Sequence, residues 1–212
     1  MERSLSAFVE RLLAALDGYD ETEAERILDE LLERFELEEA IARVLMPFLV
    51  EVGDRWESGA FSVTQEHFAS HLVRSRLTAN VGDVMPAEVG RTVVVACAPG
   101  ERHDIAPLAF SVLMRRAGWQ VRYLGADTPT ADLAFACKRI EPDLVVVAAS
   151  RRTAMLDAAP GVRRIAARHP VAIAGAGATR ALAQELGAVW LDGDVSEGAR
   201  RALSVLSDEP AG

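Results

Sequence analysis

The sequence predicts a four-helix bundle followed by an α/β domain with a five-stranded parallel sheet, and three observations support this expectation. Over the first 80 residues, apolar side chains recur at helical spacing. Beyond residue 90, five short apolar runs alternate with amphipathic segments, which is typical of a parallel sheet covered on both faces. The charge changes near the same point: residues 1–90 carry 8 basic and 19 acidic side chains, whereas residues 91–212 carry 15 and 13. We therefore expect two domains, residues 1–87 and 88–212.

Helix breakers divide the first domain. Asp17-Gly18 ends the first apolar run, and Pro47 lies inside the third, where a proline kinks a helix or marks a local irregularity. Short connections between amphipathic helices make an antiparallel bundle the expected packing. The helices are expected at about residues 5–16, 22–32, 37–52 and 62–80.

In the second domain, each expected strand is followed by a helix. Ligands bind such sheets beyond the carboxyl ends of the strands, where the strand order reverses. The loops at that edge are 97–104, 125–130, 149–155 and 175–179. The strands are expected at 92–96, 120–124, 144–148, 171–174 and 188–191, and the helices at 104–117, 130–140, 156–167, 178–186 and 196–206.

Composition excludes several classes of protein. The net charge of the 212 residues is −9, so a non-specific nucleic-acid binder is not expected. No apolar run reaches the roughly 20 residues that a membrane span needs, and the acidic, amphipathic N-terminus is unlike a signal peptide. Cys97 and Cys137 lie in apolar runs without metal-site spacing, which indicates buried thiols. We expect a cytoplasmic globular protein.

The loop after the first strand places a histidine between two carboxylates. It reads Gly100-Glu101-Arg102-His103-Asp104-Ile105. A metal-bound histidine usually has its second ring nitrogen held by a carboxylate or carbonyl, and Glu101 is placed to hold His103 in this way. The alternative is a surface loop in which Asp104 caps the next helix.

Three other segments carry weaker signals. Gly125-Ala126-Asp127-Thr128-Pro129 is a strand-to-helix turn with a capping residue and a proline near the helix start. Gly175-Ala176-Gly177 allows a backbone to approach a bulky ligand closely. In the bundle, Trp56 is followed by nine residues and then by Glu66-His67, for which core packing is the alternative explanation.

Together these residues resemble cobalamin-binding modules, in which a helical cap precedes a flavodoxin-like (Rossmann-type) domain, as in methionine synthase and the corrinoid methyltransferase proteins. Within that group, residues 1–206 are most similar to the light-sensing cobalamin domain of CarH/LitR-type regulators. Three features carry the resemblance: Trp56 with Glu66-His67, the loop from Gly100 to His103, and the string Leu-Gly-Ala-Asp-Thr-Pro that ends at Pro129.

The resemblance implies that adenosylcobalamin is held between the cap and the sheet domain. His103 would be the lower axial ligand of cobalt, with Glu101 behind it, and Trp56 would face the upper ligand. Visible light would break the cobalt–carbon bond and change the domain packing or the oligomeric state, which would be the signal. The implied cofactor-binding residues are Trp56, Glu66, His67, Glu101, His103, Asp104, Ile105, Gly125, Asp127, Thr128, Ser150, Arg151, Gly175, Ala176 and Gly177.

The sequence also departs from the pattern of the family. Ala106, Arg151 and Ala176 replace residues of the generic methyltransferase motifs, which weakens that reading more than the sensor reading. Glu57 stands where CarH-type sensors carry the histidine that resembles a second cobalt ligand, so either another residue, such as His67 or His71, takes over that role or the photochemistry ends differently. A MerR-type DNA-binding domain is not part of the sequence, so we do not expect the chain to bind DNA itself.

Several alternatives remain at this point. Photocobilins, which are stand-alone relatives, hold a bilin such as biliverdin beside the cobalamin, and the 22 arginines of this chain, for instance Arg151-Arg152, suit its propionates. A corrinoid methyl carrier that serves a methyltransferase and a cobalamin-dependent antirepressor or adaptor are the other functions considered. A homo-oligomer or a signalling protein is the expected partner, and catalysis by the chain alone is not expected.

Overall fold

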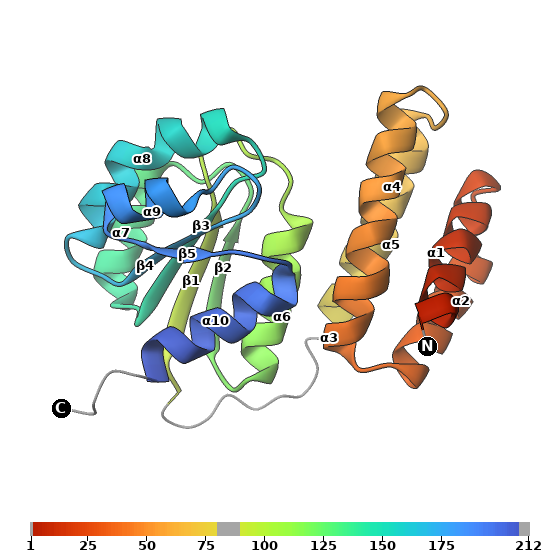
Figure 1. Ribbon diagram of the computed structural model, residues 1–212, viewed down its shortest axis with the longest axis horizontal. Coiled ribbons are helices and arrows are strands. Elements are labelled where there is room, and N and C mark those ends of the chain that lie inside the picture. The colour runs from red at the N-terminus through yellow and green to blue at the C-terminus, as the bar shows by residue number, and fades with distance from the viewer. Residues whose placement is uncertain (1, 80–89, 208–212) are drawn as a thin grey trace. The chain divides into compact units, whose positions relative to one another are not determined.

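The computed structural model describes residues 2–79 and 90–207, and the chain divides into two compact units, Met1–Asn80 and Val81–Gly212 (Figure 1). The expected boundary between residues 87 and 88 lies outside the described residues. Within the part of the chain that is described, no helix is both long enough and apolar enough to cross a bilayer.

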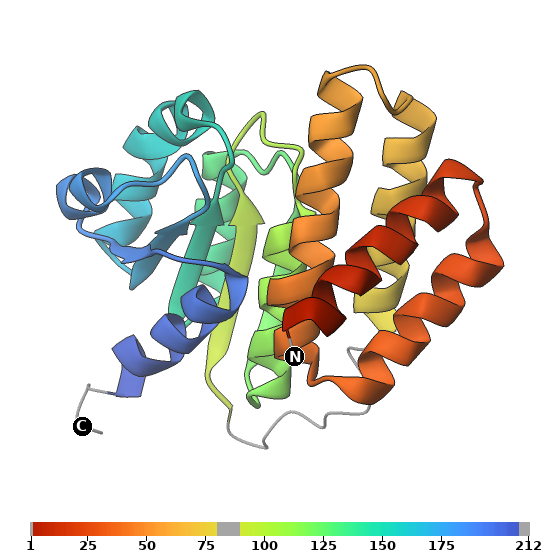
Figure 2. The same cartoon turned by 45° about the vertical axis from the view of Figure 1, so that its right-hand side comes forward.

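The first unit is a bundle of amphipathic helices, as predicted (Figure 2). Helix α1 packs against α2, α4 and α5, and α4 and α5 pack against each other. The apolar stripes of these helices meet in one core, whose fully buried side chains include Phe8, Leu16, Ile27, Phe48 and Leu77. The elements are α1 (Glu2–Asp17), α2 (Glu21–Arg34), α3 (Leu37–Ala40), the π-helix η1 (Ile41–Leu45), α4 (Met46–Glu57) and α5 (Val63–Ala79).

The irregularity predicted at Pro47 is a π-helical turn. The η1 segment ends two residues before Pro47, and the Met46 N–H bonds to the Ile41 carbonyl five residues back. Proline cannot donate a backbone hydrogen bond, and its ring crowds the carbonyl four residues earlier. The wider turn places Pro47 in the first turn of α4, where a missing N–H costs little.

The second unit is a doubly wound parallel sheet in the order β2-β1-β3-β4-β5, which is the flavodoxin-like order (Figure 1). Helices α7, α8 and α9 cover one face, and α6 and α10 cover the other. The strands are β1 (Thr92–Cys97), β2 (Gln120–Gly125), β3 (Leu144–Ala148), β4 (Val171–Ala174) and β5 (Val189–Leu191). The helices are α6 (Ile105–Arg116), α7 (Thr130–Ile140), α8 (Arg152–Ala166), α9 (Arg180–Leu186) and α10 (Val195–Ser207).

The strand order reverses between β1 and β3, so the loops that follow these two strands flank the switch point. A register shift lies beside it: Val95 pairs with Tyr123, but the next residue, Ala96, pairs with Gly125. The extra residue, Leu124, makes a bulge at the carboxyl end of β2, and such bulges redirect the chain near ligand sites.

Helix α8 begins at Arg152, four residues before the predicted start at 156. Its first turn buries Ala154 and Met155 in the core. Two arginines and a threonine precede those side chains, so apolar periodicity alone does not reveal this turn. The earlier start places Ser150 and Arg151 directly at the helix N-terminus.

Candidate functional site

Glu101 is the centre of a polar cluster where the loop after β1 meets the loop after β3. Its carboxylate is fully buried. Oε1 accepts hydrogen bonds from the His103 backbone N–H (2.9 Å) and from ring Nδ1 (2.7 Å). Oε2 accepts from the Ser150 N–H (2.8 Å) and hydroxyl (2.6 Å), and from the Arg151 N–H (3.3 Å). One carboxylate thus ties together the two loops that flank the switch point.

Hydrogen bonding keeps this buried carboxylate ionised. Burial by itself raises the pKa of a carboxyl group, because the anion loses its solvation. The hydrogen bonds from Ser150 and His103 outweigh burial and lower the pKa of Glu101 to about 2. The Ser150 and Arg151 donors lie at the N-terminus of α8, where the helix dipole also favours an anion.

His103 presents its imidazole to solvent from this anionic base. Its side chain is 77% exposed, whereas that of Glu101 is 1% exposed. An ionised carboxylate can only accept, so Nδ1 carries the proton that points at Glu101. Among the described residues, none hydrogen-bonds Nε2, whose lone pair is available in the neutral ring. Histidines that bind metals are arranged in this way, so these residues fit a metal-centred group bound through one axial nitrogen.

One further loop, the one after β2, and the Arg151 side chain also contact the segment that carries His103. The Gly100 N–H donates to Asp127 Oδ1 (2.6 Å), and the Asp127 N–H donates to the Glu101 carbonyl (2.8 Å). The Arg151 guanidinium donates to the Gly100 carbonyl (2.5 Å). The side chains predicted at Asp127 and Arg151 are therefore at the site, but each is bonded to the protein backbone.

The glycines after β4 allow two loops of the protein to approach each other closely. A Cβ atom on Gly175, whose φ is +87°, would lie 2.4 Å from the Ala149 carbonyl oxygen. A Cβ on Gly177 would lie 2.5 Å from the Arg151 carbonyl oxygen. The sequence predicts close approach here to a ligand, whereas in the structure the approach is to the loop that carries Ser150. Ala176, between the two glycines, has an exposed side chain.

The remaining predicted residues of the sheet unit have mainly structural contacts. Asp104 occupies the N-cap position of α6, but its carboxylate makes no capping bond and instead accepts from the Tyr123 hydroxyl (2.9 Å). Ile105 is the first residue of α6. The Thr128 hydroxyl donates to the carbonyl of Gly125, at the end of β2 (3.3 Å).

Sequence reasoning missed Tyr123, which holds the start of α6 through Asp104. Its hydroxyl also donates to the Asp104 backbone carbonyl (3.0 Å). Tyr123 lies on β2 just before the bulge, and the available signal was a tyrosine one residue from the carboxyl end of the strand expected at 120–124. The sequence indicated Gly100, at φ +73°, only as part of a motif. In the structure its N–H bonds to Asp127 and its carbonyl accepts from Arg151.

The other predicted side chains lie in the helical unit. Trp56 is in the last turn of α4, and its large apolar indole is 48% exposed. Glu66 is in the first turn of α5, where its two oxygens contact His67 Nδ1 (2.6 Å) and the Ser70 hydroxyl (2.7 Å). Because α4 and α5 are joined by a short loop, these residues lie at one end of the bundle. They are exposed or half-buried, which does not fit core packing.

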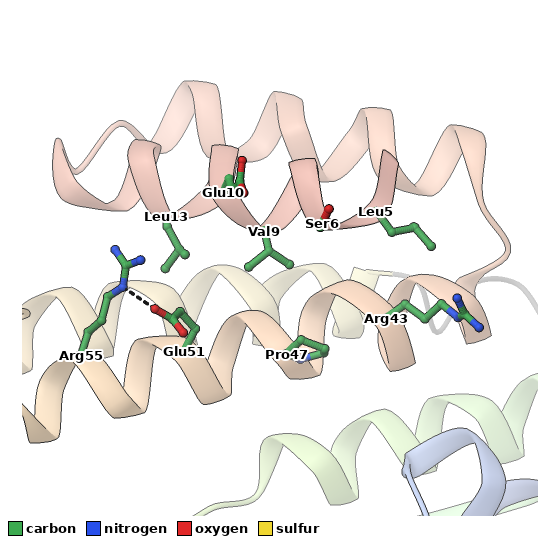
Figure 3. Close-up of a pocket in the computed structure, with 9 residues that line it drawn as sticks. All are labelled: Leu5, Ser6, Val9, Glu10, Leu13, Arg43, Pro47, Glu51 and Arg55. Atoms are coloured by element: carbon green, nitrogen blue, oxygen red, sulfur yellow. Dashed lines mark hydrogen bonds and ion pairs between the residues drawn. The ribbon is translucent and has the colours of Figure 1, made fainter. Parts of the chain in front are cut away.

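The helical unit also contains a pocket of about 560 Å³ between α1 and the η1–α4 segment (Figure 3). Its apolar side is formed by Leu5, Val9 and Leu13 of α1. Arg43 and Arg55 lie toward its two ends, and Arg55 is hydrogen-bonded to Glu51 (2.7 Å).

Both parts of the chain match sequence models of known protein families. Residues 91–201 match the sequence model of a family described as B12 binding domain, and residues 9–79 match a second model with the same description. The first of these matches covers more than half of the chain, and the two together cover both units.

The relatives fall into two groups. Over 136 residues the chain is 38% identical to the HTH-type transcriptional repressor CarH of Myxococcus xanthus, and the match covers 64% of this chain and 45% of CarH. Over 171 residues it is 26% identical to dimethylamine corrinoid protein 3 of Methanosarcina mazei, and the match covers 74% of this chain and 99% of that protein. The chain therefore spans less than half the length of CarH.

A solved structure has the same fold. The monomethylamine corrinoid protein of Methanosarcina barkeri superposes with a TM-score of 0.79 at 18% sequence identity, covering 94% of this chain and 99% of that one. At this level of sequence identity, the similarity shows only that the two proteins share a fold.

Proposed function

The chain belongs to the B12-binding family and is a cobalamin-binding protein, and from this premise we propose that it is a cobalamin-dependent light sensor. In this proposal the protein holds adenosylcobalamin in the dark. When bound, this cofactor supplies a cobalt–carbon bond that visible light breaks. The two light states differ in their contacts with the protein, and that difference in contacts changes its packing or oligomeric state.

The observation that carries the proposal is the exposed imidazole of His103 on the buried, ionised Glu101. His103 would hold cobalt through Nε2, while Glu101 fixes the ring and its tautomer through Nδ1. Ser150 stabilises the anion from the other loop.

The helical unit contributes the side chain that responds to the upper ligand. Trp56 is proposed for this role because a half-exposed indole is available for contact with a bulky apolar group. Glu66 and His67 are hydrogen-bonded to each other on the neighbouring helix α5. They are proposed to contribute polar contacts to the same ligand. The identity to the transcriptional repressor CarH, which is higher than that to the corrinoid protein, favours a regulatory protein over a carrier.

An absorption spectrum tests the proposal. Protein loaded with adenosylcobalamin should show a spectrum that changes irreversibly or slowly under green light, and His103→Ala should give the form in which no base is bound to cobalt. Trp56→Ala should weaken binding of adenosylcobalamin more than that of hydroxocobalamin. A His103→Ala spectrum identical to that of the wild type would refute the assignment of the axial ligand.

A corrinoid methyl carrier is the second candidate, and the 99% coverage of the dimethylamine corrinoid protein favours it. A carrier would hold its corrinoid through the same histidine, and its cobalt would have to reach a reduced state and a methyl donor. Reductive titration with a methyl donor distinguishes the two functions, because a carrier cycles through Co(I) and a sensor instead responds to light.

A bilin such as biliverdin is proposed as a second chromophore on the basis of the pocket in the helical unit. The pocket combines an apolar wall with Arg43, whose guanidinium suits a propionate, whereas Arg55 is bonded to Glu51 and Glu10 also lines the pocket. The Arg151 considered from sequence is instead bonded to Gly100. Protein expressed with biliverdin should show a red-absorbing band in addition to the corrin bands, and Arg43→Gln should diminish that band alone.

A further inference from the structure

We propose that Asp127 and Arg151 are positioning residues that clamp the loop carrying His103 at a single residue, Gly100. This inference rests on the proposed function, because it concerns the histidine assigned to cobalt. It gives the two side chains a role different from the direct cofactor contact expected from sequence.

The clamp holds both sides of Gly100. Its N–H donates to Asp127 Oδ1 at 2.6 Å, and its carbonyl accepts from the Arg151 guanidinium at 2.5 Å. The Asp127 N–H adds a third bond, to the Glu101 carbonyl at 2.8 Å. The loop after β1 is therefore fixed by the loops after β2 and β3 on either side of it.

The loop needs external support because it has little internal structure. Residues 101–104 belong to no helix or strand, and Gly100 has a φ of +73°. Asp127 itself has a φ of +47°, a left-handed conformation that costs a non-glycine residue about 1 kcal/mol. Such strain persists where surrounding contacts hold the backbone in place, and here those contacts are the bonds to Gly100 and Glu101.

Gly100 is a sensitive point because it directly precedes Glu101. A shift of the Gly100 peptide moves the carboxylate that accepts from His103 Nδ1, and the imidazole then loses its fixed orientation. Asp127 and Arg151 thus act on His103 through Glu101. Their contribution is the preorganisation of an axial ligand, which partners of metal-binding histidines commonly supply.

Three substitutions at position 127 separate hydrogen bonding from backbone strain. Asp127→Asn retains an oxygen acceptor and tolerates positive φ. Asp127→Gly removes the acceptor but relieves the strain, whereas Asp127→Ala removes the acceptor and keeps the strain. We expect Asp127→Gly and Asp127→Ala to bind adenosylcobalamin about tenfold more weakly. Asp127→Asn should be close to the wild type, and Arg151→Gln should behave like Asp127→Gly.

Two readouts report the clamp without the cofactor. Amide hydrogen exchange at Gly100 should accelerate in Asp127→Gly. The ring ¹⁵N signals of His103 in full-length, cofactor-free protein should shift from the tautomer protonated at Nδ1 toward a mixture. A role in global stability alone would leave both signals unchanged under native conditions.

Matched controls lie elsewhere in the same unit. Asp143 also accepts one backbone N–H, from Thr92 at 2.6 Å, but at the opposite end of the strands. Arg163 pairs with Glu185 at 2.7 Å on the outer surface of α8. Asp143→Ala and Arg163→Gln should leave the His103 ring signals and cobalamin affinity at wild-type values.

The outcomes separate this inference from the proposed function. If the cobalamin spectra of the wild type and of His103→Ala are identical, the proposed function is overturned. The measurements on cofactor-free protein would still test the clamp. Binding through His103 with ring signals, Gly100 exchange and affinity all unaffected in Asp127→Gly and Arg151→Gln would overturn the clamp. An Asp127→Asn variant as impaired as Asp127→Gly would also overturn it.

Discussion

Glu101 carries its negative charge without access to bulk water. Five hydrogen bonds from His103, Ser150 and Arg151 replace that water, and three of the five come from backbone N–H groups. Backbone donors are fixed by the fold, so they do not reorganise when the imidazole exchanges its own partner. A carboxylate held in this way can orient His103 whether or not Nε2 has a ligand.

The ionisation of Glu101 predicts acid sensitivity of the cofactor-free protein. Its folded-state pKa of about 2 is below the ordinary value of 4.5, so the anion stabilises the fold above pH 4.5. This contribution decreases as the pH falls from 4.5 toward 2, and in total it corresponds to about 3 kcal/mol. Urea unfolding measured between pH 6 and pH 2 should show the loss.

Glu101→Gln is the control for this prediction. It should lower the free energy of unfolding at pH 6, because an amide nitrogen would face hydrogen-bond donors. The variant should lack the part of the pH dependence that Glu101 contributes. Parallel pH profiles for the two proteins would show that another group causes the acid sensitivity.

At the scale of elements, the glycine in α8 lies where two helices meet. A Cβ on Gly161 would lie 2.2 Å from Thr130 Oγ1 and 2.3 Å from Thr130 Cβ, at the start of α7. The second of these atoms belongs to the stem of the side chain, which cannot rotate away. Helix propensity favours alanine over glycine by about 1 kcal/mol, but here packing opposes it.

Two alanine substitutions should therefore differ in their effect on stability. Gly161→Ala should destabilise the protein by about 1–3 kcal/mol, because α7 and α8 must separate. Gly198→Ala in α10 should be neutral or stabilising, because a Cβ there meets Leu191 Cβ at an ordinary 3.7 Å. Thermal unfolding of both variants checks the pair, and a Gly161→Ala variant as stable as the wild type would refute the packing argument.

Elements with their own apolar pattern were predictable from sequence. The run of β-branched residues in β1 and the apolar stripes of the bundle helices each predict a buried element from a few neighbouring residues. Pro47 likewise predicts the irregular turn before α4, because it lacks a backbone N–H. The start of α8 was not predictable in this way, because its first turn is stabilised by burial of Ala154 and Met155 in a core formed by other elements.

The same distinction applies to the site. Glu101 and His103 are two residues apart, so their pairing was visible as a local motif. The bonds from Gly100 to Asp127 and Arg151 join residues 27 and 51 positions apart, and only the strand order brings them together. Asp127 was proposed from its turn, but its partner depends on the sheet topology.

At the scale of the whole molecule, the two units divide the chemistry and the charge. The sheet unit holds the imidazole and its carboxylate at the switch point, and its half of the sequence is nearly neutral. Residues 1–90 have a net charge of −11 and contain the exposed Trp56. A strongly acidic unit resists non-specific self-association, so assembly of the protein should depend on specific contacts that a ligand state can alter.

The proposed sensor therefore predicts a light-dependent change in size. Full-length protein loaded with adenosylcobalamin in the dark should change its oligomeric state or hydrodynamic radius after green light, because the two states differ in their contacts with the protein. Light scattering coupled to size-exclusion chromatography measures both quantities. Protein loaded with hydroxocobalamin is the matched control, since it has no cobalt–carbon bond to break, and it should elute identically in light and dark. An adenosylcobalamin complex whose spectrum responds to light while its size and shape stay constant would place the signal in a local change instead, and such a complex that also cycles through Co(I) with a methyl donor would favour the carrier.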